Sequence, residues 1–339
     1  MLRDYAAKES GLTNGNGLDA LGQAANEIAA SEVFTDYRER RAANTIRRHD
    51  ADLAKFAEYL RSKGVQVGDL AHDAQAWTGV TWGLAAGFMR WQLNQGYAVN
   101  TVNARLSAVK TYSQLAMKAG AIDVEAYALI KAVEGYSRKE VKRINEHRSA
   151  AGIETRRGLK KAEAVSLANG SADALKAQPD TPQGRRDALV MSLLLDHGLR
   201  VSEVEGLRVD DFDLEAGTVT FYRPKVDNTG THRLSADTWQ AAREYLTQSM
   251  NGFAGPLLMG SHKGGKLSGT MSSRAIAKRV RALGEQVGKH GLSPHDCRHY
   301  AATKLAKEKS IPELMDIFGW TSSATAVRYI EAAKIVEVE

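Results

Sequence analysis

The uneven placement of proline is the feature that most constrains how this 339-residue chain folds. All six prolines lie at or after Pro179, so no proline interrupts a helix in the first half of the chain. Apolar residues recur there with helical spacing and the runs end at glycines. The three clearest runs are Ile46, Leu53, Phe56 and Leu60 before Gly64, then Trp82, Ala85, Met89 and Leu93 before Gly96, then Val102, Leu106, Val109 and Ala116 before Gly120.

These runs predict a bundle of four or five helices over residues 32–134, with Asn100 as the cap of its third long helix. Residues 1–31 are expected to be flexible, with one short helix around 18–30. Several basic side chains are expected at the bundle surface, where a solvated helix face is the alternative to a binding surface. They are Arg47, Arg48, Arg105 and Lys110.

The composition is that of an ordinary globular protein, with 43% hydrophobic and 25% charged residues. The net charge of +6 permits a polyanionic partner without requiring one. A single cysteine, Cys297, excludes an internal disulfide framework and a cysteine-built zinc site. The start of the chain shows no secretory signal, and the most apolar stretch, 188–195, is too short to cross a bilayer. We therefore expect a cytoplasmic protein without membrane segments.

The second half of the chain is mixed in character. Residues 135–158 are rich in Arg and Lys and are interpreted as a basic linker, with a solvated mixed-charge helix as the alternative. The alternating segment 217–235 predicts a β-hairpin around an Asn-rich turn. Helices are predicted over 160–168, 185–197, 236–250, 271–285, 294–308, 311–318 and 323–333. Residues 159–339 are therefore expected to form a second, α+β domain.

The segment "SPHDCRHYAATKLA" places two cationic side chains on the first turn of a helix. Ser293 suits the N-cap and Pro294 the first helical position. His295 and Arg298 then share one face at a helix end that attracts anions. The alternative is that His295 packs and Arg298 binds a nearby carboxylate.

A second segment, "LLLDHGLRVSEVEGL", places Arg200 at a corner between two helices. The first helix is expected to end at Gly198, and Ser202 with Glu205 has the spacing of a capping box for the next. An arginine on a rigid corner suits bidentate binding of phosphate. An ion pair between Arg200 and Glu203 is the alternative.

Three more residues complete a possible site. Lys225 lies where the first hairpin strand meets its turn, Trp320 follows Gly319 between two helices, and Tyr329 lies on the last predicted helix. Taken singly, solvent exposure explains the lysine, core packing explains the tryptophan and a half-buried ring explains the tyrosine.

In this order, the residues resemble the catalytic set of the tyrosine site-specific recombinases, the phage integrase family. "HGLRVSEVEGL" resembles the family's first arginine segment, and "LSPHDCRHYAATKLA" resembles its His-x-x-Arg box. The helices "NTIRRHDADLAKFAEYL" and "NTVNARLSAVKTYSQLA" resemble its N-terminal DNA-binding domain. Most members have Leu-Gly-His where this chain has Phe318-Gly319-Trp320, so the tryptophan variant of Cre-like members is present. An indole there acts as a hydrogen-bond donor or by packing.

The resemblance implies a mainly α fold with a small β-sheet, and a Tyr329 nucleophile that attacks a DNA phosphodiester to give a 3′-phosphotyrosyl link. It implies Arg200, Arg298 and Trp320 as donors to the phosphate, His295 as the base and Lys225 as the acid. Glu203 supports the site from behind, and His299 is interpreted as structural. Neither ATP nor a metal or other cofactor is implied.

The partner implied is double-stranded DNA with an inverted-repeat site, bound by a homotetramer that is a monomer or weak oligomer when free. The amphipathic segment 272–284 is expected to face the major groove with one basic side, and a solvated helix is the alternative. That side consists of Arg274, Lys278 and Arg281. A type IB topoisomerase-like enzyme, a DNA-binding protein without catalysis, and a helical protein without nucleic-acid function stay open as alternatives.

Overall fold

The structure is a computed structural model that describes residues 17–154, 166–250, 252–261 and 266–333. The chain divides into two compact units, residues 1–160 and 161–339, and each is described by itself. Helices dominate both units and small antiparallel sheets occur in the second, which confirms the predicted fold class. Among the described helices, none is long and apolar enough to cross a membrane.

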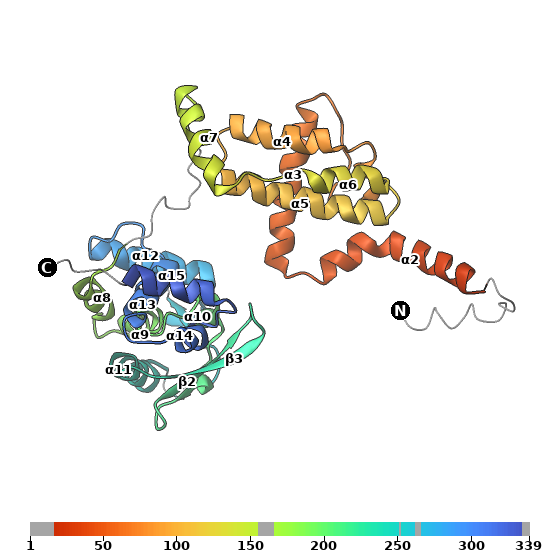
Figure 1. The fold of residues 1–339 in the computed structure, drawn as a ribbon. Helices are drawn as coiled ribbons and strands as arrows, with labels where there is room; N and C mark the ends of the chain where they lie inside the picture. Colours follow the sequence, from red (N-terminus) through yellow and green to blue (C-terminus); the bar gives the residue numbers. More distant parts are fainter. Residues whose placement is uncertain (1–16, 155–165, 251, 262–265, 334–339) are drawn as a thin grey trace. The chain divides into compact units, whose positions relative to one another are not determined.

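The first unit is a helical bundle (Figure 1). Its elements are α2 (Gly17–Glu39), α3 (Ala43–Arg61), η2 (Ala74–Trp77), α4 (Trp82–Asn94), α5 (Val99–Lys118), α6 (Val124–Ala132) and α7 (Arg138–Ala150). Helix α2 is longer than the short helix expected around 18–30. Helix α7 occupies the segment interpreted as a linker, because Ser137 and Glu140 cap each other's backbone in a capping box.

An aromatic core holds this bundle together. Trp77, Phe56, Phe88 and Tyr112 are fully buried, and the Phe56 and Phe88 rings lie 5.1 Å apart. Two details of the prediction are wrong. Trp82 is 53% exposed because it lies on the first turn of α4, and Asn100 lies inside α5, whose N-cap is Ala98.

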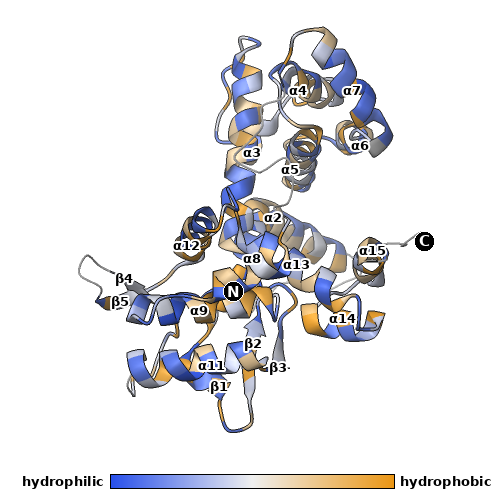
Figure 2. Ribbon diagram, turned by 90° about the vertical axis from the view of Figure 1, so that its left-hand side faces the viewer, coloured by the Kyte–Doolittle hydropathy of each residue, from blue (hydrophilic) through white to orange (hydrophobic). Residues whose placement is uncertain are grey.

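The second unit wraps helices around one central helix. Its helical elements are α8 (Asn169–Lys176), α9 (Pro182–Leu195), α10 (Val201–Gly206), η3 (Val209–Asp211), α11 (Ala236–Tyr245), η4 (Leu246–Met250), α12 (Ser273–Gln286), α13 (Pro294–Leu305), α14 (Ile311–Phe318) and α15 (Ser323–Ala333). The hydrophobic C-terminal half of α9 is buried at the centre (Figure 2). The helix predicted over 160–168 falls mostly on residues 155–165, which lie outside the described residues.

Two small sheets complete the unit. One has the order β1-β2-β3, formed by Phe212–Asp213, Thr218–Arg223 and Asn228–Arg233, and the other pairs β4 (Met259–Ser261) with β5 (Leu267–Thr270). The pairing of β2 with β3 confirms the predicted hairpin. A separate apolar cluster lies under α13, α14 and α15, with Phe318 and Leu314 fully buried in it. This cluster positions the three helices that carry most of the site.

Candidate active site

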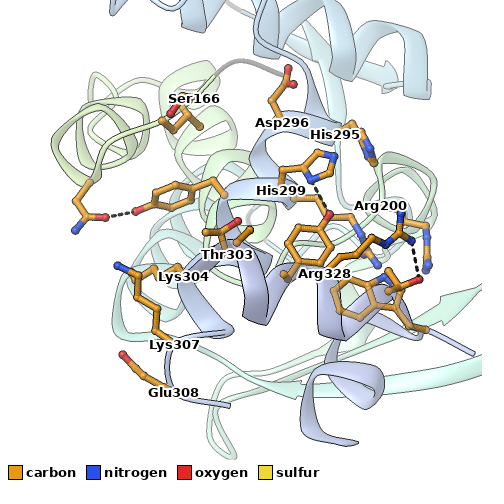
Figure 3. Close-up of a pocket in the computed structure, with 18 of the residues that line it drawn as sticks. Ser166, Arg200, His295, Asp296, His299, Thr303, Lys304, Lys307, Glu308 and Arg328 are labelled. Carbon is orange, nitrogen blue, oxygen red and sulfur yellow. Dashed lines mark hydrogen bonds between the residues drawn. The ribbon is translucent and has the colours of Figure 1, made fainter. Parts of the chain in front are cut away.

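One cavity of about 1200 Å³ in the second unit is lined by all six residues predicted to be catalytic. They are Arg200, Lys225, His295, Arg298, Trp320 and Tyr329. They come from five parts of the fold: the α9–α10 corner, the hairpin turn, helix α13, which carries both His295 and Arg298, the loop after α14, and helix α15. Figure 3 shows two of them, Arg200 and His295, among the side chains that line the cavity. The fold therefore brings together six side chains that are spread between Arg200 and Tyr329 in the sequence.

The corner that carries Arg200 is built on a buried carboxylate. Glu203 is 2% exposed, and its two oxygens accept from the Arg200 backbone N–H at 2.7 Å and from Nη1 of its guanidinium at 2.6 Å. The helix starts at Val201, with Arg200 at the cap position, so the predicted capping box of Ser202 and Glu205 is wrong. The ion pair that the sequence left as an alternative is thus present, and it fixes the arginine at the cavity edge.

Arg298 is held even more tightly. It is 7% exposed, its Nη1 donates to the Gly198 carbonyl at 2.7 Å, and its Nη2 donates to the Phe318 carbonyl at 2.6 Å. Burial, and then the charge of Arg200, lowers the pKa of Arg298 to about 10, so the guanidinium stays charged at neutral pH. The same Nη1 lies 4.0 Å from the Glu203 carboxylate, so the guanidinium is fixed from two sides at the cavity wall.

The loop after α14 places Trp320 against the tyrosine. Gly319 adopts φ +55°, which ends the helix, and the backbone N–H of Trp320 donates to the Met315 carbonyl at 2.9 Å. The indole is stacked between Phe318, at 4.7 Å between ring centroids, and Tyr329, at 5.1 Å. The stacking is therefore present, and hydrogen-bond donation from the indole to a phosphate stays a prediction.

Two residues behind the site, buried Arg223 and half-buried His232, were missed by the sequence interpretation. Arg223 is 5% exposed and donates to the Asp316 and Ile317 carbonyls at 2.8 and 3.0 Å. His232 lies 3.1 Å from the same Ile317 oxygen. Together they bind the C-terminal carbonyls of α14. The signal was present, because strand alternation puts Arg223 on the same inward face as Val219 and Phe221.

The tyrosine hydroxyl is hydrogen-bonded to a histidine that the sequence interpretation treated as structural. The Tyr329 Oη lies 2.6 Å from Nδ1 of His299 (Figure 3). The His295 ring lies edge-on to the His299 ring, 4.3 Å between centroids, one helical turn earlier on α13. The i, i+4 spacing of the two histidines was the available signal, since it places both on one face. His299 therefore belongs to the site.

The electrostatics of this pair are set by burial and by the arginines. Burial raises the pKa of Tyr329, against the opposing charges of Arg298 and Arg328. Burial also lowers the pKa of His299, and the neighbouring His295 lowers it further. At neutral pH both partners of the hydrogen bond are therefore neutral.

Helix α12 has the predicted amphipathic pattern. Ile276, Val280 and Leu283 are buried, while the basic side of Arg274, Lys278 and Arg281 is exposed. Asp187, fully buried on α9, anchors the helix by accepting from Nε of Arg279 at 2.6 Å. The basic side is thereby held in a fixed orientation relative to the cavity.

The basic residues of the first unit differ from the prediction. Arg47 and Arg48 are exposed, as expected. Arg105 is not a surface residue, because its side chain is 12% exposed and packs on the Tyr97 ring at 4.2 Å while donating to Gln92 at 3.1 Å. Lys110 is half-buried, and burial lowers its pKa. Among the described residues, no group of three His, Cys, Asp or Glu side chains could hold a metal ion.

A helical bundle followed by an α+β unit, with a tyrosine, two arginines and two histidines around one cavity, is the arrangement expected of a tyrosine recombinase. Sequence comparison agrees with this class. A sequence model of the phage integrase family matches residues 159–335, so the chain belongs to that family. Tyrosine recombinase XerC of Xylella fastidiosa (strain M23) is 30% identical over 187 residues, which cover 53% of this chain and 60% of that protein. The match thus spans less than two thirds of that relative. XerC of Methylobacterium nodulans is 27% identical over 317 residues, covering 91% of this chain and 90% of the relative.

Solved structures share the fold. A lambda integrase dimer bound to a COC′ core site matches with a TM-score of 0.58 at 14% identity, covering 100% of this chain and 87% of that one. The Tn1549 transposon integrase in complex with transposon right end DNA also matches with a TM-score of 0.58 at 14% identity, covering 88% and 94%. At this identity, the likeness concerns the fold alone.

Proposed function

We propose that this chain is a site-specific DNA recombinase that cleaves and rejoins DNA strands through a 3′-phosphotyrosyl intermediate. The observation that carries the proposal is the cavity in which the Tyr329 hydroxyl lies among two fixed arginines, two histidines and Lys225. A phosphodiester needs such an arrangement of one nucleophile and several preoriented cationic donors. The family membership and the XerC relatives support the same activity.

The proposed step is an exchange of one phosphorus–oxygen bond for another. The Tyr329 Oη attacks phosphorus, the bond to the 5′ oxygen breaks, and Lys225 gives that oxygen a proton to leave a free 5′-hydroxyl. Arg200 and Arg298 donate to the non-bridging oxygens, where charge builds up as phosphorus becomes five-coordinate. Attack by a 5′-hydroxyl from another strand reverses the step, and bond energy is conserved in the phosphotyrosine, so no ATP is consumed.

The remaining residues have supporting roles in this proposal. Glu203 holds the Arg200 corner, and Trp320 fixes the Tyr329 ring by stacking. His295, exposed at the cavity mouth, is placed to contact the phosphate or the attacking strand. Like the proton transfer from Lys225, these roles are tested by substitution and single-turnover cleavage.

The proposed DNA contacts come from both units. The exposed basic side of α12 suits the major groove, and Arg47 and Arg48 give the bundle a basic edge. We assign residues 32–134 as a core-binding domain, 135–158 as the basic connection and 159–339 as the catalytic domain. Arg105 and Lys110, which are partly buried, are proposed to position the helices of this surface rather than to contact DNA directly.

A tetramer on two inverted-repeat DNA sites, acting in the cytoplasm, completes the proposal. One structural neighbour is a lambda integrase tetramer bound to a Holliday junction, with a TM-score of 0.56. Exchange between two duplexes requires four cleavages, and four copies of one nucleophile supply them by symmetry.

Covalent capture tests the function. The protein is incubated with sheared DNA from its source, denatured, and the protein-bound fragments are sequenced, with Tyr329→Phe in parallel. Adducts that need Tyr329 and collect at one inverted repeat support the proposal. Adducts scattered without sequence preference indicate a topoisomerase-like enzyme. DNA binding without any adduct indicates a binding protein that lacks catalysis.

A further inference from the structure

The two histidines on the exposed face of α13 are not equivalent toward the nucleophile. His299 Nδ1 is 2.6 Å from the Tyr329 Oη, and its ring centroid is 5.5 Å from the tyrosine ring. His299 is half-buried between α13 and α15, whereas His295, one turn nearer the helix start, is exposed. A proton acceptor must be within hydrogen-bond reach of the proton that it takes. The described geometry puts His299 at that distance.

The protonation states agree with this geometry. A phenol whose pKa is raised by burial keeps its proton at neutral pH and donates it in a hydrogen bond. A histidine whose pKa is lowered is neutral at the same pH, and in its Nε2–H form Nδ1 accepts. The short contact is then an Oη–H···Nδ1 hydrogen bond that points in the direction of proton transfer.

We propose that His299 is the catalytic base that accepts the proton of Tyr329 during strand cleavage, an assignment that rests on the proposed recombinase function. The proton moves from Oη to Nδ1 as the Oη–phosphorus bond forms and the bond to the 5′ oxygen breaks, leaving an imidazolium and a phosphotyrosyl diester with the same single negative charge as the DNA phosphate. In the reverse reaction the imidazolium returns the proton to the leaving Oη. This replaces His295, which the sequence favoured as the base.

The surroundings tune this base through several charges. Burial of His299 and the positive groups near it disfavour the imidazolium. The protonated His299 therefore readily returns its proton to the tyrosine in the reverse reaction. The phosphate that enters the cavity brings the compensating negative charge. The titratable and charged groups that line the cavity with His299 come from four parts of the unit. They are His295, Asp296, Arg298, Tyr300, Lys304, Lys307 and Glu308 from α13 and the turn after it, Arg328 and Tyr329 from α15, Arg200 from the α9–α10 corner, and Lys225 from the hairpin turn.

Single-turnover cleavage as a function of pH tests the assignment. The substrate is a duplex carrying the captured site, with a nick a few nucleotides beyond the cleavage position. Cleavage then releases a short fragment that bears the 5′-hydroxyl, and its loss by diffusion prevents rejoining. His299→Ala removes the base, and His299→Gln keeps a hydrogen-bonding group that cannot accept a proton. His295→Ala is the matched control, the same change one turn earlier on the same helix. Thermal midpoints and DNA affinity show that each variant is folded and bound.

The wild-type rate should fall as the pH drops through the pKa of His299, which lies below the ordinary value near about 6.5. Both His299 variants should lose about 10²- to 10⁴-fold in rate at pH 7 and lose this acidic limb. Added imidazole should restore part of the rate to His299→Ala. His295→Ala should keep the acidic limb, even where its rate is lower.

Three results would overturn the assignment. A normal rate for His299→Gln would show that the histidine only positions the hydroxyl. An acidic limb that persists in His299→Ala and disappears in His295→Ala would return the role to His295. If the wild-type protein forms no adduct with any DNA, the recombinase function itself fails, and that result is distinct from a wild-type adduct that is indifferent to His299.

Discussion

The arginines of the site depend on a single buried carboxylate. Glu203 binds Arg200 at 2.6 Å and lies 4.0 Å from Nη1 of Arg298, and it is almost entirely shielded from water. Its negative charge offsets two guanidinium groups that would otherwise repel each other. Removing it leaves buried positive charge without a counterion, which is costly in a low-dielectric interior.

We expect Glu203→Ala to lower the free energy of unfolding of the catalytic unit by about 3–5 kcal/mol. Glu205→Ala, an exposed change on the same short helix, should leave it nearly unchanged. Urea unfolding monitored by circular dichroism measures both. Equal losses of unfolding free energy in the two variants would show that the Glu203 carboxylate does not stabilise the two arginines.

Two stacked histidines, buried His197 and half-buried His232, make the catalytic unit sensitive to acid. His197 and His232 stack at 5.6 Å, and burial lowers their pKa values to about 4 and about 3. These values lie below the unfolded value near about 6.5, so between about pH 6.5 and 4 the unfolded chain binds protons that the folded unit excludes. Stability is therefore lost as the pH falls through this window and is independent of these groups above it.

At pH 5, each of the two histidines should cost the catalytic unit about 2 kcal/mol relative to pH 7. His232→Asn removes one of these groups. The loss of unfolding free energy between pH 7 and pH 5 should therefore be smaller in this variant by the contribution of one histidine. Urea unfolding at both pH values checks this, with the exposed His290→Asn as control. A slope that is the same in His232→Asn and the wild-type protein would contradict the assigned burial effect.

At the residue scale, short-range chemistry was predictable and contacts made through the fold were not. The Ser293 cap and the Arg200–Glu203 pair follow from spacings of three residues. The His299–Tyr329 bond joins positions 30 apart on different helices, so no local pattern separates His299 from a packing residue. Arg223 is similar, because its partners are carbonyls 93 and 94 residues away.

At the scale of elements, the C-terminus of α14 is the part of the scaffold on which the site depends most. Its carbonyls accept from Arg223, His232 and Arg298, and the glycine that follows turns the chain toward Trp320. A side chain at Gly319 would be strained at φ +55°, and its Cβ would lie 2.7 Å from Nη1 of Arg223. Both effects move the helix end away from the arginines.

We expect Gly319→Ala to cost about 1–2 kcal/mol from backbone strain, with an added cost from displacing Arg223. The cleavage rate should fall more than DNA affinity, since the displaced helix end binds Arg298 and precedes Trp320, which both line the cavity, whereas the basic side proposed to bind DNA lies on α12. Gly288→Ala, also at positive φ but with open space around its Cβ, is the matched control for strain alone. Equal losses of rate in the two variants would argue against a special role for this helix end.

The exposed basic side of helix α12 is the surface predicted to bind DNA. Arg274→Ala removes one exposed cation and should weaken DNA binding and lower the slope of log affinity against log salt by about one unit if it contacts a phosphate. Arg243→Ala, an exposed arginine on α11 at the far side of the unit from α12 (Figures 1 and 2), should change neither. Salt-dependent binding assays measure both. An unchanged affinity in Arg274→Ala would remove this face of α12 from the interface.

Elements with strong periodicity were predictable within a few residues. The hairpin and the helices α12, α13, α14 and α15 agree with the sequence interpretation because apolar spacing and turn residues coincide at their ends. Caps were less predictable, as Asn100 and Ser202 show. The two helices concerned begin after Ala98 and Arg200, neither of which caps its helix with its side chain, so a polar residue nearby did not mark the helix start.

At the scale of the whole molecule, two separate cores explain the division into units. The first core is aromatic and lies among α2 to α6, and the second is aliphatic and surrounds α9. The sequence interpretation placed a connection between domains at 135–158 because the helical runs end near residue 134 and basic residues follow, and the two compact units divide at residue 160. The helical state of α7 was not predictable, because its mixed charges suit a solvated helix and an extended connection equally well.

The central claim is that Tyr329 forms the covalent bond to DNA. Digesting the captured adduct with nuclease and protease and mapping the nucleotide-bearing residue by mass spectrometry tests it most directly. We predict a nucleotide 3′-phosphate on Tyr329 and a free 5′-hydroxyl on the released strand. A nucleotide on Tyr300, the other tyrosine lining the cavity, or a 5′-phosphate linkage would contradict the account.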